Sequence, residues 1–216
     1  MKASTLLPVA AMVYVLAWVF GLVTAPSRPT DGAAGAVREY FVQHGGAAIA
    51  QSLLVHGAAG VALAAIAWSL ARSVERARAA VLGLGLAAAA FSLIQVAILL
   101  PVAIGADSLS AVAVDQRIAW VDTVDTVKLS ALAAFAVISS TAAVSFGLAG
   151  RWLVPFAVLL ALLLLAGGVS FLVSSSALTG ALYVSLPLLL LWVGVVGVTA
   201  ARHVPEHTVT PAAVRY

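Results

Sequence analysis

The chain contains no cysteine and few charged residues. Of its 216 residues, 9% are charged and 63% are hydrophobic. The absence of cysteine excludes disulfide bonds, thiolate metal sites and cysteine nucleophiles. A soluble domain usually carries about 25% charged residues, and a disordered chain has low hydrophobicity, so this composition excludes both classes. We therefore expect a chain whose main solvent is lipid.

Motifs that identify a reaction are also absent. The sequence has no glycine-rich phosphate loop, nucleophile elbow or paired acidic metal motif. Its net charge of +3 comes from scattered basic residues rather than a dense run, which argues against binding of nucleic acid. Residues 203–207 (HVPEH) match the spacing of a zinc protease class, but Pro205 interrupts the helix that the zinc ligands would need. We expect no metal, no haem and no other cofactor.

Long uncharged segments are the main feature that is present. A membrane-spanning helix needs about 20 apolar residues, and the segments between residues 3 and 201 provide six such helices, the last two separated by a break at residues 174–180. The segments lack the alternation of a β-barrel. We therefore predict an all-α, polytopic integral membrane protein, a six-transmembrane-helix bundle within a single domain (residues 1–200), followed by a short cytoplasmic tail (residues 201–216). The expected helices cover residues of about 5–25, 47–71, 79–103, 123–149, 152–173 and 181–200.

The first segment also resembles a secretory signal peptide. Lys2, the apolar stretch and Val23-Thr24-Ala25 fit the charged, apolar and small-residue parts of such a signal. The apolar stretch is longer than the usual 7–15 residues or so, and Pro26 would follow the cut. We expect this segment to remain as a helix.

The distribution of lysine and arginine predicts the orientation. Cytoplasmic connections carry an excess of these residues, and the alanine- and leucine-rich composition is typical of a GC-rich bacterial gene. We therefore predict a multi-pass protein of a bacterial inner membrane, with both termini in the cytoplasm. This orientation places seven basic residues inside (Lys2, Arg72, Arg76, Arg78, Arg151, Arg202, Arg215) and four outside (Arg28, Arg38, Arg117, Lys128).

Two connections on the outer side are longer than a hairpin needs. They cover residues of about 26–46 and 107–122, and each contains a stretch that mixes apolar and polar residues, at 33–43 and 111–120. We predict a short amphipathic helix in each connection, with Gly45-Gly46 ending the first. Because connections carry function more often than scaffolds do, the outer side is expected to meet the ligand or partner.

Ionisable residues inside the spans indicate a candidate site. An ionisable side chain at the centre of a spanning helix costs roughly 2.5–3.5 kcal/mol on insertion scales. Asp122, Asp125 and Lys128 are spaced to share one helix face, so Asp125 and Lys128 are expected to form an ion pair. In the alternative interpretation, the two acids cap the start of the helix and Lys128 extends outward to water.

Polar residues on two further helices lie at a similar depth. His56, with Ser52 and Gln51 close by, lies on the second expected helix, and Gln95 lies on the third. We predict that His56, Gln95, Asp125 and Lys128 converge on one polar pocket that opens outward. The alternative is that these residues form local hydrogen bonds that tie helices together. The ligand-pocket candidates are therefore Asp125, Lys128, His56, Gln95, Asp122, Gln51 and Ser52.

Three functions remain open at this stage. The first is binding or transport of a small lipophilic or charged molecule in the outward-facing pocket. The second is an intramembrane enzyme acting on a lipid or isoprenoid, such as an isomerase or cyclase, with Asp125 or His56 as acid or base. The third is a non-catalytic accessory subunit. The expected partners are the lipid bilayer, a small lipophilic ligand, and another membrane protein or a second copy of the chain.

Overall fold

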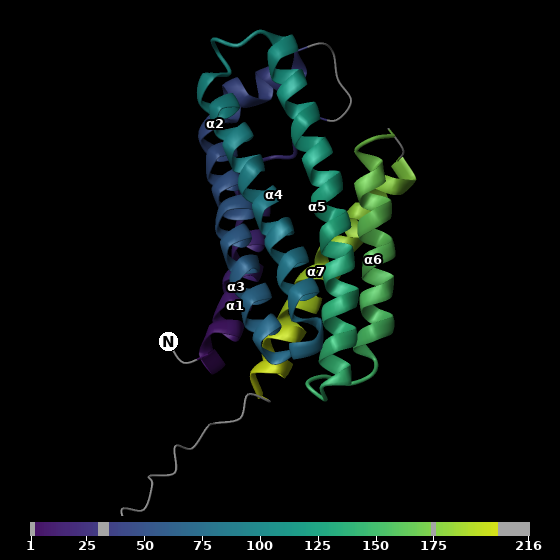
Figure 1. Cartoon of the computed structure of the whole chain (residues 1–216). Coiled ribbons are helices and arrows are strands. Elements are labelled where there is room, and N and C mark those ends of the chain that lie inside the picture. The colour runs from purple at the N-terminus through teal and green to yellow at the C-terminus, as the bar shows by residue number, and fades with distance from the viewer. Residues whose placement is uncertain (1–2, 30–34, 174–175, 203–216) are drawn as a thin grey trace, which may run out of the picture.

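The computed structural model describes residues 3–29, 35–173 and 176–202, and within these residues all regular secondary structure is helical (Figure 1). Six helical stretches are long and apolar enough to cross a membrane. The predicted all-α architecture with six such helices is therefore confirmed for the described part of the chain. Residues 203–207, which carry the zinc-protease-like spacing, lie outside the described residues. The elements are α1 (Ala3–Thr24), α2 (Ala36–Ser52), the π-helix η1 (Leu53–Ala58), α3 (Ala59–Ser73), the short 3-10 helix η2 (Glu75–Ala77), α4 (Arg78–Gly105), α5 (Ala111–Ser145), α6 (Leu153–Ser170) and α7 (Ser176–Arg202).

The amphipathic stretch of the first long connection forms the start of α2, where a kink separates it from the helix that continues through η1 and α3. The stretch of the second connection is not a separate short helix but forms the opening turns of α5. A kink at His44 (φ −121°, ψ 19°) stands beside the glycine pair where a break was expected. Ser110 begins α5 because its side chain accepts a hydrogen bond from the backbone nitrogen of Ala113 at 3.2 Å.

These extensions form a structure that we call the cap (residues 36–48 and 102–118). At 1.5 Å per residue, the 35 residues of α5 are about 52 Å long, whereas the hydrocarbon core of a bilayer is about 30 Å thick. Arg38 ties the two parts together by donating from Nε to the Leu109 carbonyl (2.8 Å) and from Nη2 to the Asp107 carbonyl (2.6 Å). In Figure 1 the cap lies at the end of the bundle opposite the start of α1. A separate small core fills the cap: Tyr40, Phe41, Ala48, Val102, Ala103, Ala106, Val114 and Ile118.

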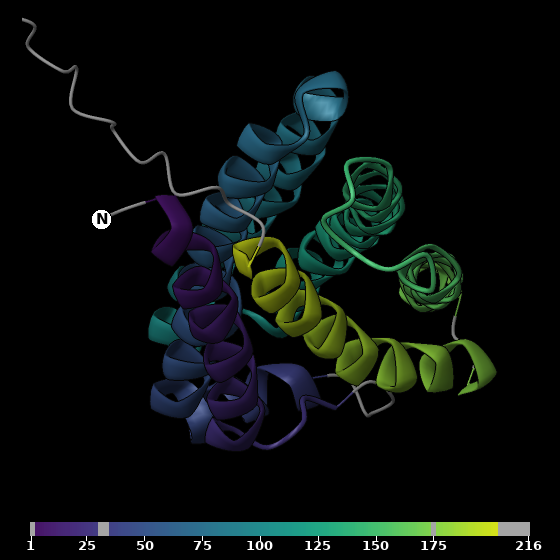
Figure 2. The same ribbon diagram turned by 90° about the horizontal axis from the view of Figure 1, so that it is seen from below.

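Helix α7 crosses the bundle diagonally. Figure 2 shows it beginning beside α6 and ending beside α1. It reaches α1 closely at Gly197, where a Cβ atom would collide with Ala11, and its buried Trp192 packs edge-to-face on Phe135 of α5 with ring centroids 5.7 Å apart. The Trp192 indole nitrogen also donates to Ser140 Oγ at 2.9 Å. The diagonal path therefore packs α7 tightly in the half away from the cap, and the hollow described below lies in the half nearer to it.

Candidate functional site

Lys128 is buried at the centre of the site. Its side chain is 4% exposed, it forms an ion pair with Asp125 one turn earlier on α5, and its Nζ donates to Gln95 Oε1 of α4 at 2.7 Å. Gln95 is itself completely buried, and its Nε2 donates to the Val121 carbonyl at 3.5 Å. The lysine is thus neutralised by one neighbour and hydrogen-bonded by another, which is the condition under which a charge can stay buried.

The helix-cap interpretation of the two acids is wrong. Because α5 begins at Ala111 rather than near residue 123, Asp122 and Asp125 lie about three and four turns inside the helix. Lys128 does not extend to water either, and it cannot be counted among the exposed basic residues of the outer side. Asp122 instead pairs with Arg28, which follows α1, at 2.9 Å.

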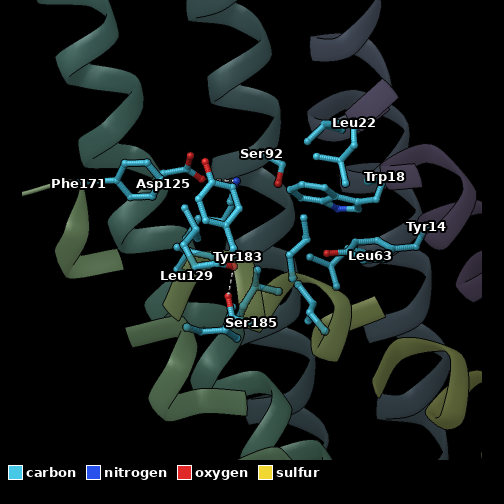
Figure 3. Close-up of a pocket in the computed structure, with 18 residues that line it drawn as sticks. Tyr14, Trp18, Leu22, Leu63, Ser92, Asp125, Leu129, Phe171, Tyr183 and Ser185 are labelled. Atoms are coloured by element: carbon cyan, nitrogen blue, oxygen red, sulfur yellow. Dashed lines mark hydrogen bonds and ion pairs between the residues drawn. The ribbon is translucent and has the colours of Figure 1, made fainter. Parts of the chain in front are cut away.

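A cavity of about 220 Å³, which we call the chamber, lies beside the ion pair (Figure 3). Its wall includes four polar residues, Asp125, Lys128, Ser92 and Ser185. Aromatic rings come from Tyr14, Trp18 and Tyr183. Most of the remaining wall is aliphatic, so the chamber presents a mainly apolar surface with a charged group at one side. Its other lining residues are Leu22, Val55, Ala59, Leu63, Leu129, Leu132, Leu164, Phe171, Leu182, Leu186 and Leu189.

A second hollow of about 330 Å³, which we call the vestibule, adjoins the chamber on the side of the cap. The two share Asp125 and several apolar residues, so the carboxylate stands at their boundary. The Arg28–Asp122 ion pair lies in the vestibule wall, and the Tyr40 hydroxyl there donates to the Pro26 carbonyl at 3.0 Å. The whole vestibule is lined by Trp18, Leu22, Ser27, Arg28, Tyr40, Phe41, Ala48, Gln51, Ser52, Val55, His56, Leu99, Val121, Asp122, Asp125, Phe171, Leu182 and Tyr183.

Within the part of the chain that the structure describes, two polar atoms of the vestibule are buried without a hydrogen-bond partner. They are Ser52 Oγ and His56 Nδ1, and both residues line the wall. His56 is close enough to Asp125 and Lys128 to interact with them electrostatically. It belongs to the π-helix η1, and such widened turns within α-helices are frequent at functional sites.

Glycine allows the first two spans to approach each other at this level. A Cβ atom on Gly21 of α1 would collide with the Val55 side chain of η1, so the missing side chain leaves room for Val55 against α1. On the other side, Thr126 of α5 donates to the Gly168 carbonyl of α6 at 2.9 Å. These contacts pack η1 against α1 and α5 against α6, and all four elements contribute residues to the walls of the hollows.

The structure places all seven candidate residues in or against the two hollows. Six line a wall, and Gln95 supports Lys128 from behind. Sequence reasoning missed Arg28 and the aromatic residues Trp18 and Tyr183. Arg28 could have been found from its position. It directly follows a span on the side with fewer basic residues, and the next outer connection contains acids that it could pair with. The aromatic residues gave none, because rings are common at the ends of spanning helices.

Within the described residues, no group of three histidine, aspartate or glutamate side chains is placed to hold a metal ion. The site is therefore characterised by one buried ion pair, one partly exposed ion pair, two unpartnered polar atoms and an apolar chamber. Comparisons with known protein families, with curated proteins and with solved structures find no match to this chain.

Proposed function

We propose that the chain is a membrane protein that binds a small amphiphilic molecule, with its apolar part in the chamber and its polar part in the vestibule. The observation that carries this proposal is the Asp125–Lys128 ion pair at the boundary between the two hollows. Pockets for small ligands are typically concave and mainly apolar, with a few polar groups that fix orientation. The combination of chamber and vestibule matches this description.

Energetic cost supports a functional role for the pair. Buried ion pairs are often replaceable by apolar residues without loss of stability, and ionisable residues within spanning helices are costly. A bundle built only to pack its helices would have no need for Lys128 at 4% exposure. Its presence beside a hollow is accounted for if the pair contacts a bound molecule.

The side of the chamber nearest to α7 supports entry from the bilayer. Leu22 of α1 and Tyr183 of α7 line both hollows, yet they are 46% and 70% exposed. An amphiphile in the membrane could therefore enter between α1 and α7 with its apolar part leading. This route would suit transport or delivery of a lipophilic molecule between the bilayer and the space outside the cap.

We place the cap on the outer side of a bacterial inner membrane, with both termini in the cytoplasm. The connections at the end opposite the cap contain or adjoin four arginines and one acid, namely Arg72, Arg76, Arg78, Arg151 and Glu75. The excess of arginine at that end fits the positive-inside rule. The vestibule would then face the non-cytoplasmic side.

Ligand-dependent thermal stability tests the proposed function. The purified protein in lipid nanodiscs is heated with three probes of equal chain length: 1-dodecanol, dodecylamine and dodecyl phosphate. We expect at least one probe to raise the melting temperature of the wild type saturably, and to have no such effect on the Asp125→Asn/Lys128→Met double variant. Asp115→Asn is the matched control, because Asp115 is an exposed acid on the same helix. Equal responses of the double variant and the wild type would contradict the proposal.

One observation favours a second function. The unpartnered His56 Nδ1 near the Asp125 carboxylate would suit proton transfer to or from a lipid or isoprenoid substrate. An enzyme of this kind would convert its ligand, so incubation with the bound molecule and chemical analysis of the extract separates it from a binding protein. An accessory subunit without a small-molecule site would respond to none of the three probes.

A further inference from the structure

Ser52 and His56 form a pair of hydrogen-bonding groups that the protein itself leaves unused. They are one turn apart on one side of the α2–η1 stretch, and both line the vestibule. Ser52 is 4% exposed, and among the described residues its Oγ has no hydrogen-bond partner and neither has the buried Nδ1 of His56. A buried polar atom without a partner destabilises the protein, and a ligand that supplied a hydrogen bond would remove this cost.

The formal charges around the vestibule already cancel within the protein. Arg28 pairs with Asp122, and Lys128 pairs with Asp125. A charged ligand head would have to break one of these pairs or bind without a free counter-charge, and both are unfavourable compared with a neutral head. The buried polar atoms left over are a hydroxyl oxygen and an imidazole nitrogen, which bind uncharged oxygen-bearing groups well.

We propose that Ser52 and His56 form the head-group subsite, and that the ligand is a neutral amphiphile with a hydroxyl or carbonyl head and an aliphatic or isoprenoid tail. This inference rests on the proposed function and specifies its ligand class. The head lies in the vestibule between η1 and the Asp125–Lys128 pair, and the tail extends into the chamber toward Leu63 and Leu132.

The shape of the site agrees with this assignment. The vestibule wall, on the side of the cap, carries more polar side chains than the chamber wall does, and Asp125 belongs to both walls. Trp18 and Tyr183 line both hollows, so flat apolar surfaces flank the path from head to tail. A neutral head needs no counter-ion during entry between α1 and α7, which lowers the cost of passing through the apolar part of the membrane.

The test compares head groups and removes the subsite. In nanodiscs, 1-dodecanol should raise the melting temperature of the wild type saturably, whereas dodecylamine and dodecyl phosphate should have smaller effects. Ser52→Ala and His56→Leu should each weaken the apparent affinity for dodecanol about tenfold, the loss of one hydrogen bond. Ser69→Ala is the matched control, because Ser69 Oγ is also buried without a partner but lines neither hollow.

A conservative variant keeps the test informative if a subsite variant folds poorly. His56→Gln retains a side chain that forms hydrogen bonds, so it should bind dodecanol more tightly than His56→Leu does. Preference for the amine or the phosphate, or unchanged dodecanol affinity in both Ser52→Ala and His56→Leu, would overturn the neutral-head assignment while leaving the proposed function standing. Absence of a response to all three probes would overturn both.

Discussion

Lys128 and Asp125 neutralise each other inside the bundle, and Gln95 holds the lysine from the neighbouring helix. Each charge depends on the other because removal of one partner leaves a buried charge without compensation. The pair therefore behaves as one unit, both for stability and for any ligand that approaches it.

A double-mutant cycle tests this coupling. Lys128→Met should lower the free energy of unfolding by about 3 kcal/mol, because the Asp125 carboxylate loses its cation. The Asp125→Asn/Lys128→Met double variant should recover much of that loss. Unfolding by a denaturing detergent in mixed micelles measures the difference. Strictly additive effects of the two single substitutions would contradict the coupling.

At the scale of elements, close helix approach depends on particular glycines. A Cβ atom on Gly45 would lie 2.9 Å from the carbonyl oxygen of Ala103 on α4, whereas a Cβ atom on Gly46 would have no neighbour within 4 Å. Only the first of these adjacent glycines is therefore needed for contact between α2 and α4, which builds the cap above the vestibule.

The two glycines provide a matched pair of variants. Gly46→Ala should stabilise the protein by up to about 1 kcal/mol through helix propensity, and Gly45→Ala should destabilise it because the α4 backbone must move. The same unfolding assay compares them. If Gly45→Ala were as stable as Gly46→Ala, the packing of α2 on α4 described above would be incorrect.

The elements also show how far the sequence can predict this protein. Hydropathy alone predicted six spans, because a run as long and apolar as residues 79–106 fits few structures other than a membrane-spanning helix. It did not predict that residues 111–120 would continue the helix of Asp125, since an amphipathic segment is compatible with a separate interfacial helix or with the end of a longer one. The first turns of α5, which begin at Ala111 after the Ser110 cap and set the depth of the two acids, pack into the small core of the cap, and this packing cannot be predicted from local sequence.

The site was predictable in its polar members and not in its shape. Helical spacing indicated the pairing of Asp125 with Lys128, and the cost of polar groups in lipid directed attention to His56 and Gln95. The chamber depends instead on the diagonal course of α7, and no local pattern in α7 signals a crossing angle. The π-helix at Leu53–Ala58 likewise has no sequence signature that we can identify.

At the scale of the whole molecule, the orientation in the membrane is open to direct measurement. The natural chain has no cysteine, so a single introduced cysteine is its only thiol. Ser108 lies at the cap end and Ser145 at the opposite end, and both are exposed. In intact cells a membrane-impermeant maleimide should label Ser108→Cys and should label Ser145→Cys only after lysis. The reverse pattern would place the cap in the cytoplasm.

Occupancy of the hollows by an amphiphile is tested most directly through Trp18, which lines both of them. The probe is 11-bromo-1-undecanol, whose bromine quenches indole fluorescence on contact, and the Trp18 signal is the difference between the wild type and Trp18→Phe in nanodiscs. We predict saturable quenching of this signal, and its loss in the Asp125→Asn/Lys128→Met variant. Binding at this site would be contradicted if quenching rose in proportion to the amount of probe in the bilayer without saturating, and to the same extent in the wild type and in the double variant.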